Sequence, residues 1–486
     1  MKWTTGLTGF DEAFTRDGKP RPHYKSVVQA LGALTDEQIQ YRGKLQEISA
    51  RNQGITFNVY GSDEGEERVF PFDFVPRIIP AKEWNQIERG LIQRTTAINL
   101  FLLDVYSDQK CLKDGLLPYD LVLSRSDFRR ELQNVQPPHK VYTHVVGSDL
   151  IRDDKGTYLV LEDNCRCPSG VSYVVQNRTT LQRTFPELFN KLPVRPVRNY
   201  ADLLREALEF MAPRGHGHGL TVVLTPGRAN SAYFEHSFLA REMGVLLVEG
   251  NDLIVEDNFV YVRTTAGKKP VDVIYRRIDD EFLDPLSFRK DSILGVPGLI
   301  NAYRSGNVAL ANAPGAGVAD DKAIYPFIPA IIKYFLDEDP IIEQVPTYMG
   351  FRKNEFTYIL ANLDKLVVKR TDGSGGYGML MGPQSTEKER QAYAANMKKA
   401  PGSYIAQPLV EISAHPTYLD GAYKARRLDL RPYVLYGDRI KILPGGLTRV
   451  ALTEGSYVVN SSQGGGSKDT WVLMDTNDKK KGTGIQ

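Results

Sequence analysis

The sequence predicts a mixed fold with α/β and α+β parts and an additional helical region at the N-terminus. Helical periodicity dominates residues 1–140, strands and helices alternate over 219–320, and short strands surround one predicted helix from about residue 365 onward. The 486 residues, 42% of them apolar, are enough to bury a large core in two to four domains.

The composition excludes several classes of protein. Lys and Arg number 61 against 59 Asp and Glu, so the net charge of +2 gives no general electrostatic reason to expect a nucleic acid or a membrane surface as partner. No apolar run reaches the length of a membrane span or a signal peptide. The three cysteines, Cys111, Cys165 and Cys167, are too few for a disulfide framework and fit a reducing compartment. We therefore expect a cytoplasmic protein that binds neither nucleic acid nor membrane.

The first two regions are predicted from one helix and one hairpin. Apolar residues recur near helical spacing from Ala81 to Tyr106, so this helix should bury one face. Apolar β-branched residues from Val141, a polar cluster at 153–156 and a second apolar run that ends at Asn164 predict a β-hairpin.

The later regions alternate between strand and helix. Strands near 220–224, 245–248 and 271–275, with a helical stretch between the first two, predict an α/β layer with some parallel pairing. A polar, basic end is typical of a frayed terminus. We divide the chain into a helical N-terminal region (1–140), the hairpin region (141–218), the α/β region (219–320), an α+β region (321–475) with a helix near 387–398, and a flexible tail (476–486).

The hairpin carries a candidate metal site. With a four-residue loop over 154–157, Asp149 lies directly opposite Glu162, and Asn164 shares the face of Glu162 by the period-two rule. Two facing carboxylates repel each other, and an all-oxygen set of this kind suits Mg²⁺ completed by phosphate oxygens. A solvated outer face with screened carboxylates is the alternative.

A glycine-rich segment is a candidate phosphate-binding loop. An apolar strand delivers Lys369, and the loop that follows lets backbone N–H groups approach an anion without obstruction by Cβ atoms. The lysine precedes the glycines, so the loop is neither a P-loop nor a Rossmann fingerprint, and a plain glycine-rich hairpin is the alternative. The glycines are Gly373, Gly375, Gly376 and Gly378.

Two further segments could complete a nucleotide site. The apolar run 404–410 contains one amide, Gln407, and could offer backbone groups to a purine. Arg431 and Arg449 carry guanidinium forks that suit a carboxylate or an acyl phosphate, although surface ion pairs are a common alternative.

Taken together, these motifs resemble those of circularly permuted ATP-grasp proteins (type 2), the group described as glutathionylspermidine-synthase-like, from about Lys140 to Trp471. In that family an aspartate and a Glu-x-Asn thirteen residues later bind Mg²⁺, which corresponds here to Asp149, Glu162 and Asn164. These ligands come last in ordinary ATP-grasp enzymes, whereas here they precede the lysine and its loop. The resemblance implies a circularly permuted ATP-grasp fold.

The resemblance also implies an ATP-binding site and a reaction. Lys322 would be a second nucleotide lysine, and the adenine hinge would start at Gln407, where glutamate is commoner. Arg431 and Arg449 would act catalytically on the substrate carboxylate or its phosphorylated form. The residues expected to bind ATP are Lys322, Lys369, Gly373, Ser374, Gly375, Gly376, Gly378, Gln407, Leu409 and Val410.

The activity expected from this resemblance is that of an ADP-forming carboxylate–amine ligase. It would use ATP and Mg²⁺ to make an amide or peptide bond through an acyl phosphate, from carboxylate and amine substrates that are small molecules or peptides. The alternatives are a nucleotide-binding scaffold without turnover and a small-molecule kinase. The sequence does not identify the acid or the amine, and nothing in it selects glutathione or a polyamine. It also leaves the oligomeric state and any protein partner unassigned.

Overall fold

The computed structural model describes residues 9–58, 67–190, 192–213, 219–371, 373, 378–460 and 464–475. The predictions for Ser374, Gly375, Gly376 and the tail 476–486 lie outside the described residues.

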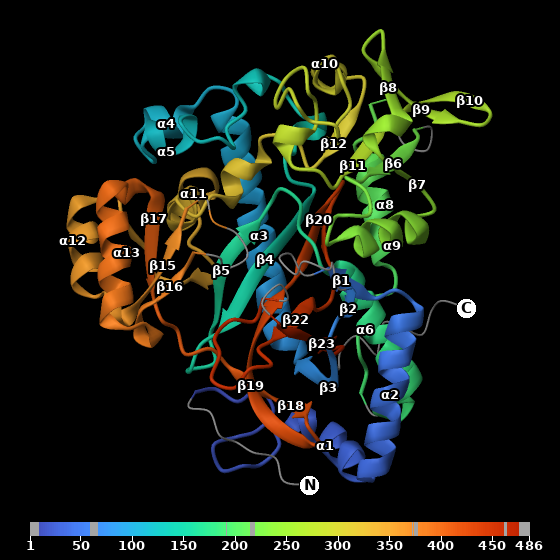
Figure 1. The fold of residues 1–486 in the computed structure, drawn as a ribbon, viewed down its shortest axis with the longest axis vertical. Coiled ribbons are helices and arrows are strands. Elements are labelled where there is room, and N and C mark those ends of the chain that lie inside the picture. Colours follow the sequence, from blue (N-terminus) through green and yellow to red (C-terminus); the bar gives the residue numbers. More distant parts are fainter. Residues whose placement is uncertain are drawn as a thin grey trace.

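Ten of the described strands form the largest sheet, which runs through the middle of the molecule (Figure 1). These strands are β3 (Phe72–Ile79), β4 (Val145–Arg152), β5 (Tyr158–Asn164), β13 (Glu343–Gln344), β18 (Ala414–Leu419), β19 (Ala422–Arg431), β20 (Tyr433–Tyr436), β21 (Ile440–Ile442), β22 (Leu447–Val450) and β23 (Gly466–Val472). The main path is β13-β5-β4-β19-β22-β23-β3, while β18 pairs with β19 and β20 pairs with β4 and β21. The sheet therefore joins the predicted hairpin to strands from the C-terminal part of the chain.

The region predicted as mainly helical also supplies strands. It contains β3, which pairs in parallel with β23, and the small pair β1 (Thr56–Asn58) and β2 (Glu67–Val69). β3 is buried on both faces and contains Pro76, so it shows neither the alternation nor the proline-free run by which a strand is recognised. The helical prediction for 1–140 thus holds for α1 (Lys25–Gly32), α2 (Asp36–Asn52), α3 (Ala81–Val105), α4 (Lys110–Lys113) and α5 (Tyr119–Leu123), and not for these strands.

The α/β region forms the expected parallel sheet. Its strand order is β12-β11-β6-β7 with parallel neighbours, and its strands are β6 (Thr221–Leu224), β7 (Leu246–Val248), β11 (Val273–Arg276) and β12 (Ala309–Ala311). An antiparallel sheet of β8 (Leu253–Glu256), β9 (Phe259–Thr264) and β10 (Gly267–Val271) projects from it (Figure 1).

A separate lobe on the left of Figure 1 carries the candidate phosphate loop. It is an antiparallel sheet in the order β14-β17-β15-β16, covered by α12 (Lys353–Ala361) and α13 (Glu387–Lys399). Its strands are β14 (Tyr348–Met349), β15 (Leu366–Arg370), β16 (Leu380–Met381) and β17 (Tyr404–Pro408). The lobe has a hydrophobic core of its own, which includes Ile359, Val368 and Met397.

The long helix α3 connects the parts of the core. It is the helix predicted from residues 81–106, and its buried face belongs to the cluster that also contains residues of β4, β5, β11 and α11 (Ile328–Leu336). The remaining helices are α6 (Val171–Thr184), α7 (Pro186–Phe189), α8 (Tyr200–Phe210), α9 (Tyr233–Met243) and α10 (Leu299–Arg304). Within the described ranges, no helix combines the length and apolar character that crossing a membrane requires.

Candidate active site

The hairpin of β4 and β5 places two carboxylates in the large sheet. Asp149 pairs with Glu162, as predicted. The loop over residues 153–157 is one residue longer than expected, and a bulge at Leu161 compensates for the extra residue. The predicted pairing is therefore correct although the predicted loop is wrong.

Two arginines converge on Asp149. Nη2 of Arg431 lies 2.7 Å and Nη2 of Arg449 lies 2.6 Å from Asp149 Oδ2, and Nε of Arg431 binds the other oxygen. Arg449 also donates from Nε to Asp429 Oδ1 at 3.0 Å. Burial raises the pKa of Asp149, but Arg431 and Arg449 outweigh this effect and hold the pKa of that carboxyl well below its usual range. Asp149 is therefore an ionised, buried partner of both arginines.

Glu162 lies where three distant segments meet. Its Oε1 is 3.9 Å from Nη2 of Arg431, and its Oε2 is 3.7 Å from Nζ of Lys322. Its side chain is 32% exposed, whereas that of Asp149 is 1% exposed. These contacts place the hairpin beside the strand that ends at Arg431, and Glu162 is the more exposed carboxylate of the pair.

The two predicted nucleotide lysines border the same cavity. Lys322 follows the short 3₁₀ helix η6 (Ala316–Asp320) and donates to the carbonyl oxygen of Gly373 at 2.8 Å. Lys369 in β15 donates to Oε1 of Gln407 at 2.8 Å. Burial, with a smaller contribution from the charge of Lys322, lowers the pKa of Lys369 to about 8, although Glu162 opposes this shift. Lys369 therefore stays largely cationic at neutral pH.

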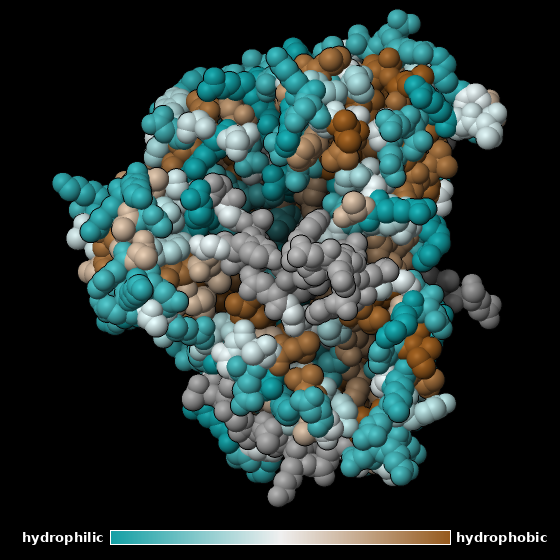
Figure 2. Space-filling model, viewed as in Figure 1, coloured by the Kyte–Doolittle hydropathy of each residue, from teal (hydrophilic) through white to brown (hydrophobic). Residues whose placement is uncertain are grey.

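The cavity is large enough for a nucleotide and a second substrate. Its volume is about 810 Å³, and Figure 2 shows a recess near the centre of this mostly hydrophilic face. The residues of the predicted hinge are part of its lining, and the described loop residue Gly378 has φ +70° with open space around its Cβ position. The predicted site residues among its lining are Asp149, Glu162, Asn164, Lys322, Lys369, Gly373, Gln407, Leu409, Val410, Arg431 and Arg449.

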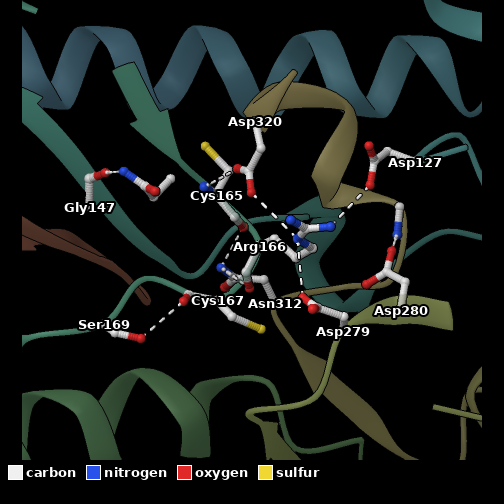
Figure 3. A network of polar contacts seen from close by, with 12 residues as sticks. Asp127, Gly147, Cys165, Arg166, Cys167, Ser169, Asp279, Asp280, Asn312 and Asp320 are labelled. Carbon is white, nitrogen blue, oxygen red and sulfur yellow. Dashed lines mark hydrogen bonds and ion pairs between the residues drawn. The ribbon is translucent and has the colours of Figure 1, made fainter. Parts of the chain in front are cut away.

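The cavity is also lined by charged residues that the sequence reasoning missed. Arg166 lies 3.2 Å from Asp127, 3.4 Å from Asp279 and 3.6 Å from Asp320, and Figure 3 shows the three carboxylates around its guanidinium. Burial raises the pKa of Asp320 to about 7, with Arg166 opposing the shift. Asn312 connects the segment of Arg166 to β4, because its Nδ2 donates to the carbonyl oxygen of Cys165 at 2.7 Å and to that of Val145 at 2.6 Å.

Arg166 and these three acids come from four separated segments of the chain, so no local spacing could have predicted their meeting. The only available signal was that Asp320 lies two residues before the predicted nucleotide lysine Lys322. The position of these acids around Arg166 is therefore a result of the tertiary structure.

The donor atoms at Glu162 and Asn164 fit a Mg²⁺ ion that is completed by phosphate oxygens. Nδ2 of Asn164 donates to Gly147 O at 3.0 Å, which leaves its Oδ1 as a donor to a metal, and Glu162 adds a carboxylate. Among the described residues, no group of three or more His, Cys, Asp or Glu side chains could hold a metal ion by itself. Asp149 would have to share its oxygens with Arg431 and Arg449, so its role as a ligand stays a prediction.

Comparison with known proteins adds a family and a fold. Residues 76–451 match the family model described as circularly permuted ATP-grasp type 2. The chain is 51% identical over 466 residues to an uncharacterised protein of Synechocystis, with 96% of this chain and 97% of that protein aligned. It is 40% identical over 465 residues to a putative glutamate–cysteine ligase of Frankia alni, where the alignment covers 96% of this chain and 54% of the relative.

A solved structure shares the fold. A glutathione synthetase-like effector from Globodera pallida, in its apo form, superposes with a TM-score of 0.57 at 12% sequence identity. The superposition covers 90% of this chain and 98% of that one. At this identity the likeness concerns the fold alone.

Proposed function

The chain belongs to the circularly permuted ATP-grasp family, type 2, and on that premise we propose that it is an ATP-dependent carboxylate–amine ligase. It forms an amide or peptide bond through an acyl phosphate and releases ADP and phosphate. The observation that carries this proposal is the convergence of Lys369, Glu162 and Arg431 on one cavity from three separate parts of the chain.

In the proposal, the two lysines and the lobe hold the nucleotide. Lys369 and Lys322 bind phosphate oxygens together with the backbone near Gly373, and the segment from Gln407 to Val410 borders the purine. Glu162 and Asn164 would hold Mg²⁺, which supplies charge neutralisation at the phosphates when bound.

In the proposal, Arg431 and Arg449 position the acyl group. An oxygen of the substrate carboxylate attacks the γ-phosphorus in line, and ADP leaves with the electron pair of the broken P–O bond. The amine then attacks the carbonyl carbon, phosphate leaves with the oxygen that attacked phosphorus, and the amine loses a proton. Arg431 and Arg449 face the place where negative charge accumulates in both steps. Because both donate to Asp149, their forks are held in position before substrate arrives.

The relatives support the reaction class and leave the substrates open. Two proteins of Frankia are named putative glutamate–cysteine ligases. Ligation of glutamate to cysteine joins a carboxylate to an amine. This chain spans about half of their length. We therefore propose carboxylate and amine substrates as classes only.

The test is an assay of ADP release with ATP, Mg²⁺ and arrayed pairs of carboxylic acids and primary amines. The proposal expects release that depends on both members of one pair, and E162Q as the matched variant should abolish it. Nucleotide binding without release under every pair would favour a scaffold. ADP formation with an alcohol, together with a stable phosphorylated product, would favour a kinase.

A further inference from the structure

The side chain of Gln407 is held in one orientation by a chain of hydrogen bonds. Its Oε1 accepts from Nζ of Lys369 at 2.8 Å, and its Nε2 donates to Oγ1 of Thr347 at 3.0 Å. The hydroxyl of Thr347 in turn donates to the carbonyl oxygen of Val345 at 2.9 Å. A hydroxyl has one hydrogen, so Thr347 can only accept from Gln407, and the amide oxygen must face the lysine.

The sheet of the lobe places these groups in register. Gln407 pairs with Val367 across β17 and β15, and Lys369 lies two residues further along β15 on the same face, at the diagonal position. Thr347 directly precedes β14, the neighbour of β17 on its other side. The relay therefore crosses three adjacent strands. Gln407 is 3% exposed, so water does not compete strongly for its amide.

Lys369 keeps its charge uncompensated in this arrangement. Among the residues that the structure describes, no carboxylate lies within ion-pair distance of its Nζ, and its hydrogen-bond partner is a neutral amide. The charged groups that act on it at longer range are Glu162 of β5, Asp149 of β4 and Lys322 after η6. An ammonium group donates three hydrogen bonds, and Gln407 accepts one of them, so with respect to the described part of the chain two N–H groups remain for an anion in the cavity.

We propose that Gln407 is a positioning residue: with Thr347 behind it, its amide oxygen aims the ammonium group of Lys369 into the cavity and leaves the positive charge free for phosphate oxygens. Only the identity of that anion rests on the proposed function. A glutamate at this position would instead form an ion pair with Lys369. The side chain of Gln407 thus has a role other than the purine contact expected from the sequence.

Three variants test whether the orientation of the Gln407 amide, and not its packing alone, acts on Lys369. They are T347V, T347S and Q407E. T347V removes the acceptor for Nε2, so the amide can turn and present N–H groups to Lys369. T347S keeps the hydroxyl and serves as the matched control. Q407E keeps the shape and adds a charge, and an opposite charge at hydrogen-bond distance raises a lysine pKa by about 1–3 units.

The measurement is the pH dependence of Lys369 acetylation by a brief pulse of acetic anhydride, read by mass spectrometry. In the wild type we expect half-maximal labelling near pH 8, because burial lowers the pKa of Lys369 to about 8. The midpoint should fall in T347V, stay unchanged in T347S and rise in Q407E. Equal midpoints in T347V and T347S, or no rise in Q407E, would overturn the proposal. If Q407E does not fold, the comparison of T347V with T347S still decides.

Nucleotide affinity distinguishes this proposal from the proposed function. At pH 7 we expect T347V to bind ADP about 10-fold more weakly than T347S, which corresponds to one lost charge-assisted hydrogen bond. Shifted labelling midpoints in a protein that binds no adenine nucleotide would support the positioning role and reject the ligase.

Discussion

At the scale of single residues, the site is governed by buried charges that neutralise one another. Asp149 and Asp429 balance Arg431 and Arg449 in the large sheet, and the pairing leaves Glu162 as the more exposed acid. A buried ion pair adds little net stability, but removal of one partner leaves an uncompensated charge. The two facing carboxylates of the hairpin are therefore not equivalent.

The difference in burial between Asp149 and Glu162 predicts stability changes of different size for two conservative variants. D149N should lower the free energy of unfolding by about 3–5 kcal/mol, because Arg431 loses its partner in a buried site. E162Q should change it by less than about 1 kcal/mol, since Glu162 is a third exposed and its cation contacts are long. Urea titration at pH 7 measures both, with D154N on the exposed turn of the same hairpin as control. Equal losses in D149N and D154N would contradict the assignment.

The same pair predicts a pH dependence. The folded-state pKa of Asp149 is depressed, so its contribution to stability is complete above the unfolded pKa of about 3.9 and is lost as the pH falls toward the folded value. The difference in stability between wild type and D149N should therefore shrink below about pH 4. A difference that stayed constant from pH 7 to pH 3 would show that Asp149 does not act as an ionised partner.

The arginine forks give a third residue-scale prediction. R431K keeps the charge beside Asp149 and loses the bidentate geometry, so it should lower kcat about 100-fold, the size of effect seen when one transition-state donor is removed. The Kd for ADP should change less than about 2-fold, because in the proposal Arg431 binds the substrate carboxylate or its phosphorylated form and not ADP. R439K, on an exposed turn, is the control. A loss of ADP binding that matched the loss of turnover would remove the catalytic role.

At the scale of elements, the sequence predicted helices and strands that show a local pattern. It missed features that depend on contacts between distant segments. The helix at 81–105, the parallel strands near 221, 246 and 273, and the pairing of Asp149 with Glu162 follow from periodicity and turn residues. The strand β3 was missed because burial on both faces removes the alternation. The three acids around Arg166 and the proposed role of the Gln407 side chain were missed, because both depend on contacts between segments that are distant in the sequence.

The lobe of β14–β17 with α12 and α13 should behave as a separate unit of stability. Its core around Val368 and Met397 is a cluster distinct from the main one, to which only Met349 of β14 belongs among the described lobe strands. M397A removes a fully buried side chain from this core and should destabilise the lobe by about 2–5 kcal/mol. Hydrogen exchange followed by mass spectrometry should then show faster exchange in β15 and β17 and unchanged exchange in β4 and β19.

The control for this prediction is K398A, which truncates the exposed neighbour of Met397 on the same helix. It should leave exchange unchanged in both places. Uniform acceleration across the whole molecule in M397A would mean that the lobe and the large sheet unfold together.

At the scale of the whole molecule, the order of the motifs along the chain explains how the site is assembled. The hairpin with Asp149 and Glu162 precedes the lobe with Lys369, yet it pairs with β19 and β20, which follow that lobe. The large sheet thus joins the hairpin to the strands that follow the lobe. The cavity lies where this sheet, the lobe and the parallel sheet meet. The overall arrangement was predictable because five short motifs kept their spacing after one cyclic shift.

The central claim is that this cavity activates a carboxylate as an acyl phosphate, and the fate of a carboxylate oxygen tests it most directly. Once an acid and amine pair that supports ADP release is known, the acid is supplied with ¹⁸O in its carboxylate, and the released phosphate is analysed by mass spectrometry. We predict ADP as the nucleotide product and one ¹⁸O atom in each phosphate, because the oxygen that attacks phosphorus leaves with it. AMP as the main product, or unlabelled phosphate during confirmed amide formation, would contradict the account.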